Sequence, residues 1–304
     1  MKQVVSISIG SSKRDHDVTL DILGQQVHIW REGTDGDMKA AADKLRRYDG
    51  KVDAFGAGGL DLFLNAADRT YWFRDAKQFL DAVKVTPMLD GSGLKGPVEA
   101  DVVRFMRDEL GLSFAGKRAM VTSALDRWGV AMALADAGCE MTYADLLYGL
   151  GIPIMLHKKS TLIRTVHTIA PIAALLPFSF LYPSEADHTT EVEAESKHSQ
   201  LYRDADIIAG DYKWVRKYMP ADMRGKWIIT NTTTEQDVDF LRSTGAELLV
   251  TSTPRLEGRT FGTNVMEATM VALDGASTSL TPERYLELLK QTGFTPDVIW
   301  LQKG

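Results

Sequence analysis

Residues 117–145 carry the side chains whose types and spacing best suit the binding of a nucleotide cofactor. A short apolar run ends at Thr122, a turn leads into a segment rich in small apolar residues, and a second apolar run ends just before Asp145. In a strand–helix–strand unit of this kind, the helix N-terminus offers free N–H groups to a pyrophosphate. An acid after the second strand accepts hydrogen bonds from a ribose, and Asp145 stands at that position.

The turn after the first strand lacks the GxGxxG pattern that normally surrounds the pyrophosphate. Arg127 can neutralise phosphate charge there, whereas Asp126 would repel a pyrophosphate and can simply cap the helix. An acid at position 145 favours the free 2′-hydroxyl of NAD over the 2′-phosphate of NADP. Gly210 and Asp211 follow a later strand, at the edge where ligands of doubly wound sheets bind. The residues expected to contact a cofactor are Thr122, Ser123, Ala124, Arg127, Asp145, Gly210 and Asp211.

Two other groups of residues were considered for ligand or metal binding. Arg255 and Arg259 lie close together after another strand and are candidates to hold a carboxylate of a substrate. No metal site is expected. The acidic segment 185–198 has histidines and glutamates at helix-compatible spacing, but no HExxH motif or cysteine ligand accompanies them, so the pattern favours a solvated helix face. The four residues concerned are His188, Glu191, Glu195 and His198.

The elements that would position these residues alternate between strands and helices. Asp37 is expected to cap a helix that runs to Tyr48, residues 84–89 read as a strand, and residues 99–110 read as a connecting helix. From residue 206 onwards, three strands alternate with helices. The predicted fold class is α/β, with an N-terminal α/β substrate domain (1–110) and a Rossmann-like, doubly wound parallel-sheet domain (111–275). A C-terminal helix and strand (276–304) are expected to pack back on the first domain.

Composition limits the class of protein. The chain has 304 residues and a net charge of -6, so it is long enough for two domains and lacks the basic character of a nucleic-acid-binding protein. Its single cysteine, Cys139, cannot form an internal disulfide and fits a reducing compartment. The most apolar segment, 169–182, is shorter than the roughly 20 residues that span a bilayer. We therefore expect a cytoplasmic protein without a membrane or nucleic-acid partner.

Residues 90–145 also carry motifs of a known family. Asp101 stands four residues before Phe105, an interval that the family shares, and the segment Gly116-Lys117-Arg118 precedes the first strand of the cofactor domain. On these motifs the chain resembles the shikimate and quinate dehydrogenases. The resemblance extends more faintly through TNTTTEQDVDFL to RTFGTNVMEATMVAL near the C-terminus.

The resemblance implies an NAD(P)-dependent oxidoreductase that transfers hydride between a nicotinamide and a secondary alcohol of a small polyhydroxy acid. NAD is the expected cofactor, with NADP as the other option. Lys95 and Asp101 would share hydrogen bonds with the reacting hydroxyl and relay its proton. The alternative for this pair is an exposed loop lysine and a first-turn helix acid.

The chain departs from the family where Glu99-Ala100 replaces the Asn-Thr of the acidic motif and where the glycine fingerprint is lost. Two other functions therefore stay open. One is a non-catalytic Rossmann-like module that binds a nucleotide or metabolite, and the other is an S-adenosylmethionine-dependent methyltransferase. The expected partner is a small molecule, and a homo-oligomer is compatible with the sequence.

Overall fold

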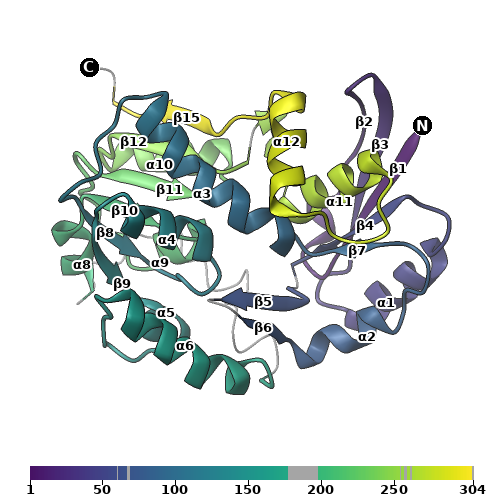
Figure 1. Ribbon diagram of the computed structural model, residues 1–304, viewed down its shortest axis with the longest axis horizontal. Coiled ribbons are helices and arrows are strands. Elements are labelled where there is room, and N and C mark those ends of the chain that lie inside the picture. Colours follow the sequence, from purple (N-terminus) through teal and green to yellow (C-terminus); the bar gives the residue numbers. More distant parts are fainter. Residues whose placement is uncertain are drawn as a thin grey trace.

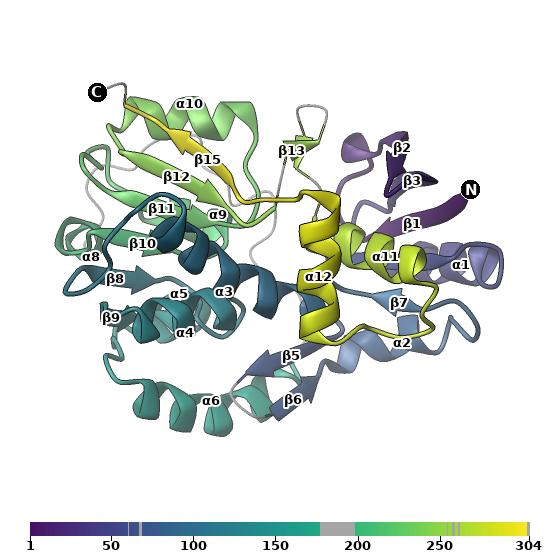
Figure 2. The same ribbon diagram turned by 45° about the horizontal axis from the view of Figure 1, so that its top comes forward.

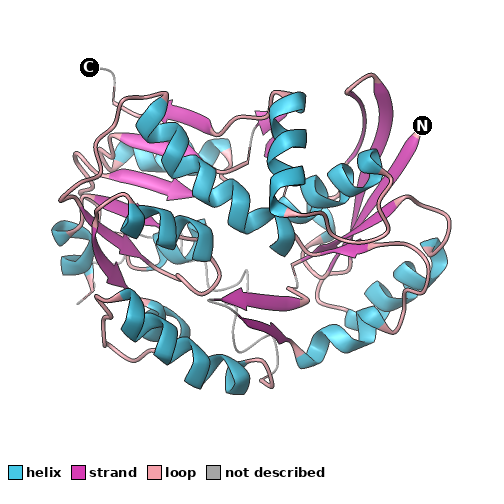
Figure 3. Ribbon diagram, in the orientation of Figure 1, coloured by secondary structure: helices cyan, strands magenta, loops and turns pink. Residues whose placement is uncertain are grey.

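The computed structural model describes residues 1–59, 61–66, 69–176, 198–253, 255–256, 259–260 and 262–302. They form two α/β domains, each with a central sheet and helices packed on it (Figure 1 and Figure 3). The predicted α/β class with a parallel, Rossmann-like second domain is confirmed by the order and direction of the strands. Within the described residues, no helix combines the length and the apolar character needed to cross a bilayer.

The first domain is built on a five-stranded sheet of order β2-β3-β1-β4-β7. Its strands are β1 (Lys2–Ser8), β2 (Asp17–Ile22), β3 (Gln25–Gly33), β4 (Ala54–Gly58) and β7 (Met88–Leu89). Strands β2 and β3 form an antiparallel hairpin, and β1 pairs in parallel with both β3 and β4. Five consecutive residues of β1 are buried, which is typical of a strand covered on both faces.

Helices from both ends of the chain cover this first sheet. Helix α1 (Met38–Tyr48), capped by Asp37 as predicted, packs on the face that carries Val5 and Phe55. The opposite face, with Val4 and Ala54, is covered by α11 (Thr263–Asp274) and α12 (Pro282–Thr292). Figure 2 shows α11 beside β1 and α12 next to α11. Helix α11 therefore belongs with the first domain and not with residues 111–275, because its apolar side chains complete the core of the first sheet.

The second domain is built on a six-stranded sheet of order β9-β8-β10-β11-β12-β15. Its strands are β8 (Arg118–Val121), β9 (Glu140–Tyr143), β10 (Ile207–Ala209), β11 (Trp227–Thr230), β12 (Leu248–Thr251) and β15 (Asp297–Trp300). The first five are parallel, and β15 is antiparallel to β12. The expected terminal strand thus returns to the second sheet and does not pack on the first domain. The strand order reverses direction between β8 and β10.

Helices lie on both faces of the second sheet because alternate residues of each buried strand point to opposite sides. Val121 faces a core that includes α4 (Trp128–Asp136) and α6 (Lys159–Ala173), whereas Met120 faces the opposite core. The remaining helices are α5 (Asp145–Leu150), α8 (Ser199–Asp204), α9 (Tyr212–Lys217) and α10 (Glu235–Ser243). The alternation of strands and helices predicted from residue 206 onwards is confirmed.

Helix α3 (Ser92–Asp108) joins the two domains and contributes to both cores. Its Leu94 and Val98 pack in the core of the first sheet, and its Val102 and Met106 pack in the core of the second. The helix begins seven residues earlier than the connecting helix expected at 99–110, directly after Gly91, whose φ of 96° ends the preceding strand. Lys95 therefore lies on a helix and not in a loop.

Shorter elements complete the described chain. They are the 3-10 turns η1 (Ser12–Arg14) and η2 (Arg74–Ala76), helix α2 (Lys77–Leu80), and the hairpins β5–β6 (Phe63–Ala66, Arg69–Trp72) and β13–β14 (Arg255–Leu256, Arg259–Thr260). The strand expected at 84–89 is reduced to Met88–Leu89, because Asp49 accepts the N–H groups of Lys84, Val85 and Thr86. Those three N–H groups are therefore not available to pair with a neighbouring strand.

Candidate functional site

The candidate site lies where the strands of the second sheet end, at the point where the strand order reverses. In open α/β sheets, ligands bind in the crevice outside the carboxyl ends of the strands at such a switch point. Here that crevice is bounded by the turn after β8 and by Gly210-Asp211 after β10. Helix α3 contributes Lys95 and Glu99 to the same place.

Arg127 is the centre of a buried network of charges. Its Nη1 lies 2.7 Å from Glu99, its Nη2 lies 3.0 Å from Asp211, and its Nε lies 3.1 Å from Asp126. Only 5% of Arg127 is exposed. Burial disfavours its charge, but the surrounding carboxylates hold its pKa well above the usual value, so Arg127 stays protonated. Three carboxylates of the protein therefore already compensate the positive charge of Arg127, which the sequence assigned to a phosphate.

Lys95 forms the second half of this network and links the two domains. Its Nζ lies 2.8 Å from Asp61, which follows β4, and 3.1 Å from Asp126 in the second domain. Burial opposes the charge on Lys95, but Asp126 and Asp61 raise its pKa above the ordinary value. Burial also opposes ionisation of Asp126, yet Arg127 and Lys95 lower its pKa to about 2. The resulting lysine–carboxylate cluster is 13–14% exposed at its side chains.

The structure does not bring Lys95 and Asp101 together. Six residues correspond to about 600° of rotation along a helix, so the two side chains leave α3 about 120° apart. Asp101 instead pairs with Arg104 at 3.0 Å on the exposed face, with 41% of its own side chain accessible. A proton relay between Lys95 and Asp101 is therefore not assembled, and the carboxylates beside Lys95 are those of Asp61 and Asp126.

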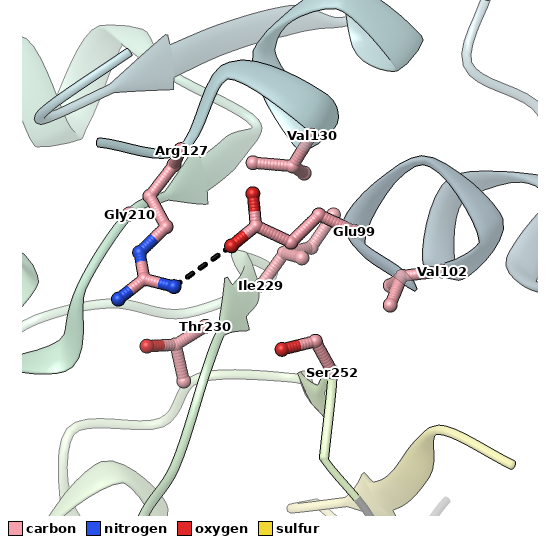
Figure 4. A pocket seen from close by; sticks show the side chains of 8 residues that line it. All are labelled: Glu99, Val102, Arg127, Val130, Gly210, Ile229, Thr230 and Ser252. Carbon is pink, nitrogen blue, oxygen red and sulfur yellow. Dashed lines mark hydrogen bonds and ion pairs between the residues drawn. The ribbon is translucent and has the colours of Figure 1, made fainter. Parts of the chain in front are cut away.

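Three buried polar atoms at this site have no hydrogen-bond partner among the described residues. They are Oε2 of Glu99, Nε of Arg127 and the hydroxyl of Ser252. These three residues line a small cavity of about 10 Å³, shown in Figure 4, which is close to the size that one water molecule needs. Its other lining residues are Val102, Val130, Gly210, Ile229 and Thr230. Buried polar groups are nearly always satisfied in native proteins, so these three mark a place where a ligand group or a water belongs.

Of the residues expected to contact a cofactor, Thr122 and Gly210 lie against each other just after the paired strands β8 and β10. A β-carbon at Gly210, whose φ is 150°, would lie 2.0 Å from the hydroxyl of Thr122. Ala124 is fully buried in the core of the second domain. Ser123 has a buried hydroxyl without a partner among the described residues. Asp211 caps α9 and also accepts hydrogen bonds from Arg127 and Asn231.

Asp145 contacts the turn that follows β8. One of its carboxylate oxygens accepts the N–H of Leu125 at 2.8 Å, and the other is buried without a partner among the described residues. Burial raises the pKa of Asp145 to about 6, although the backbone hydrogen bonds partly oppose that shift. The acid that the sequence assigned to a ribose is thus engaged in holding the turn.

The free energy of unfolding of the wild type is expected to fall between about pH 4 and pH 6, and replacing Asp145 by asparagine is expected to remove this fall. The folded-state pKa is about 6 and the ordinary value is 3.8, so the unfolded chain ionises first and stability falls as pH rises through this window. At pH 8 the variant is expected to be about 2–3 kcal/mol more stable than the wild type, because one pKa unit corresponds to about 1.4 kcal/mol. Urea unfolding at several pH values measures this difference, and equal pH slopes in the two proteins would contradict it.

A dinucleotide in the usual Rossmann mode does not fit these residues. The carboxylates of Asp126 and Glu99 stand beside the start of α4, where a pyrophosphate would bind. A β-carbon at Gly129 would lie 2.4 Å from the carbonyl oxygen of Gly96, so α3 already contacts the first turn of α4. Together with the engaged carboxylate of Asp145, these contacts occupy the positions that the pyrophosphate and ribose would need.

The remaining predicted residues lie at the limits of the described chain. The side chains of Arg255 and Arg259 are outside the described residues, although their backbone forms β13 and β14. Of the segment considered for metal binding, His188, Glu191 and Glu195 lie outside the described residues, and His198 contacts the ring of Tyr218. Among the described residues, no three histidine, cysteine or acidic side chains are arranged to hold a metal.

Sequence reasoning missed the roles of Glu99 and Asp61. Glu99 stands out in the sequence only as a departure from a motif, and Asp61 follows the glycine cluster Gly56, Gly58 and Gly59. An acid directly after a glycine-rich strand end is a usable signal for Asp61. No local signal identifies Glu99, because its partner Arg127 lies 28 positions away.

Two family models match the chain. The model of the family described as "Domain of unknown function (DUF8754)" matches residues 93–301, more than half of the chain. The chain belongs to the DUF8754 family. Residues 3–90 match a second family, "Domain of unknown function (DUF8753)", so the two matches meet at the start of α3. No curated protein sequence matches this DUF8754 member.

Solved structures show a distant likeness. A solute-binding protein of an ABC transporter from Burkholderia multivorans is 12% identical, with 98% of this chain and 99% of that chain covered and a TM-score of 0.39. A glutamate dehydrogenase is 14% identical, with 88% and 64% covered and a TM-score of 0.46. An NAD-dependent malic enzyme from Thermotoga maritima is 10% identical, with 97% and 85% covered and a TM-score of 0.37. The likeness is confined to the broad α/β architecture.

Proposed function

We propose that this protein is a two-domain Rossmann-like binding module that holds a small polar molecule at the cavity lined by Glu99 and Ser252, the switch-point cavity. The observation that carries the proposal is the set of unpartnered buried atoms, Glu99 Oε2, Arg127 Nε and Ser252 Oγ, around one cavity. An unsatisfied buried polar group costs about 1–3 kcal/mol, and a ligand group that bonds to these atoms recovers that free energy. Lys95 and Asp61 beside it extend the site to the first domain.

Filling the cavity is expected to abolish ligand binding. A metabolite library, including nucleotides and S-adenosylmethionine, is screened by thermal shift against the wild type and Ser252→Val. Every specific ligand is expected to bind the variant at least tenfold more weakly, because the added methyl groups occupy the cavity. The matched control is Ser199→Val, which alters another buried hydroxyl without a partner among the described residues, in α8 and away from the cavity. Ligands that bind both variants equally would contradict the proposal, as would a complete lack of ligands.

A second candidate is an NAD(P)-dependent oxidoreductase acting on a small polyhydroxy acid. The observation that favours it is the Lys95–Asp61 pair at 2.8 Å, a lysine and a carboxylate side by side at the domain boundary. Such a pair can hold a substrate hydroxyl and move its proton. Because the pKa of Lys95 is raised and burial raises that of Asp61, Asp61 is the better proton acceptor of the two.

Titration with NADH and NADPH separates the two candidates. Trp214 and Trp227 lie in the second domain, so energy transfer from tryptophan to the reduced nicotinamide reports binding. The binding-module proposal, together with the misfit of a pyrophosphate at α4, predicts no saturable signal. A saturable signal with either cofactor would favour the oxidoreductase, and its absence with a folded protein rules that candidate out.

A further inference from the structure

Helix α6 carries a stripe of side chains that faces away from both cores. Its buried residues recur every four positions and pack in the core of the second sheet; they are Leu162, Val166 and Ala170. A helix turns by about 100° per residue, so the residues two positions after each of these lie on the opposite side. The exposed stripe consists of Arg164, Thr168 and Ile172, and of Leu175 just beyond the helix. Both Figure 1 and Figure 2 show α6 at one edge of the molecule.

The C-terminal end of this stripe is apolar. Ile172 and Leu175 are each 64% exposed, and Leu176 beside them is 38% exposed. The N–H of Arg74 donates to the carbonyl oxygen of Ala174 at 3.0 Å, so this end of α6 is fixed against the chain that follows β6. Half of the large apolar side chains that the described residues expose lie within 150–176. Such a concentration of exposed apolar side chains marks a surface that binds a partner or a membrane.

The same region is basic, although the chain as a whole is acidic. The chain has 41 acidic residues among 304, yet positions 146–184 contain none and include Lys158, Lys159 and Arg164. Lys159 pairs with Asp136 at 3.5 Å, but both side chains are largely exposed, and such a pair is weak. Among the described residues, no carboxylate forms an ion pair with Lys158 or Arg164. Together these side chains form the α6 surface, which consists of Lys158, Arg164, Thr168, Ile172, Leu175 and Leu176.

A second copy of the chain is a poor match for the α6 surface. Two copies that met through this surface would bring their cations together, and residues 146–176 contain no acid to compensate them. Like charges placed together at an interface are unfavourable. An anionic membrane surface matches both features, because acidic headgroups attract lysine and arginine, and exposed aliphatic side chains insert at the boundary of the acyl chains.

From these observations we infer that the α6 surface docks on a membrane that contains anionic lipids. Lys158 and Arg164 contact the headgroups, and the apolar side chains at the end of α6 insert beside them. The contact is peripheral, in accord with the lack of a membrane-spanning helix among the described residues. The expectation of no membrane partner was drawn from the net charge, which averages over the whole chain. None of these side chains lines the switch-point cavity, so the inference is independent of the proposed function.

Co-sedimentation of the full chain with vesicles tests this inference. Vesicles of phosphatidylcholine mixed with phosphatidylglycerol are compared with vesicles of phosphatidylcholine alone, at low and at physiological salt. The wild type is expected to bind the anionic vesicles at least tenfold more tightly than the neutral ones. Salt is expected to weaken this binding, because it screens the charge of the headgroups. Equal binding to the two kinds of vesicle, or no binding to either, would overturn the inference.

Two variants separate the charged part of the α6 surface from its apolar part. Arg164→Glu, and the double variant Ile172→Ser with Leu175→Ser, are each expected to weaken binding to the anionic vesicles at least tenfold. The matched controls are Lys39→Glu, at an exposed cation on α1, and Val85→Ser, at an exposed aliphatic side chain before β7. Both controls are expected to bind as the wild type does. Undiminished binding of Arg164→Glu or of the double variant would show that another surface contacts the membrane and would overturn the inference.

Analytical ultracentrifugation of the same proteins without lipid tests the second copy as the occupant. The wild type and the double variant Ile172→Ser with Leu175→Ser are expected to sediment with the same mass. A wild-type oligomer that the double variant loses would overturn the inference and assign the α6 surface to contacts between copies of the chain.

Discussion

Replacing Arg127 by methionine is expected to lower the free energy of unfolding by about 3–5 kcal/mol at pH 7. The substitution keeps an unbranched side chain in place but removes the charge that three carboxylates share, those of Glu99, Asp126 and Asp211. Glu99 is 3% exposed, so water cannot replace the lost partner. Urea unfolding followed by tryptophan fluorescence measures the change.

Two further proteins make this prediction specific to the buried network. In Arg104→Met the lost partner is Asp101, on an exposed face where ion pairs contribute little, so no measurable change is expected. In the double variant Arg127→Met with Glu99→Gln, part of the stability should return because one uncompensated carboxylate is gone. A loss as small in Arg127→Met as in Arg104→Met would show that the network contributes nothing to stability.

Replacing Gly129 by alanine is expected to lower the free energy of unfolding by about 3 kcal/mol, the upper part of the range for overpacking a core. The new β-carbon would lie 2.4 Å from the carbonyl oxygen of Gly96 and 3.1 Å from the β-carbon of Glu99. The first of these is a backbone atom, so α3 and α4 must move apart. Because α3 carries Glu99 and Lys95, the same movement is expected to displace these two side chains from the site.

Gly149→Ala provides the control for this prediction. Gly149 also lies in a helix, α5, but a β-carbon there has no atom within 4 Å. Alanine favours the helix over glycine by about 0.5–1 kcal/mol, so this variant should be slightly more stable than the wild type. Thermal unfolding of the two variants side by side measures the contrast. Equal effects at the two positions would mean that α3 and α4 are not packed as closely as the structure shows.

Local patterns in the sequence were sufficient for the elements and their class. Buried parallel strands such as β11 are continuous apolar runs, and helix starts carry caps such as Asp37 and Thr281, each of which accepts a backbone N–H. These signals depend only on residues within one or two turns of each other. The α/β class, most of the strands and the edge of the sheet where the site lies could therefore be predicted.

The partners within the site could not be predicted in this way, because they depend on how whole elements rotate and pack. Lys95 is six positions from Asp101, yet it pairs with Asp61 and Asp126, which are 34 and 31 positions away. The reason is that α3 begins at Ser92 and must turn its apolar residues toward two cores, which fixes the direction of every other side chain on it.

The sequence by itself thus determined two α/β units, the parallel second sheet and the location of a site after β8 and β10. Only the tertiary structure decided that Arg127 and Asp145 are engaged by the protein, that α11 completes the first domain, and that Glu99 and Ser252 face one cavity. Secondary structure follows from neighbouring residues, whereas a site joins side chains from distant segments. These side chains come together because the two cores pack against α3.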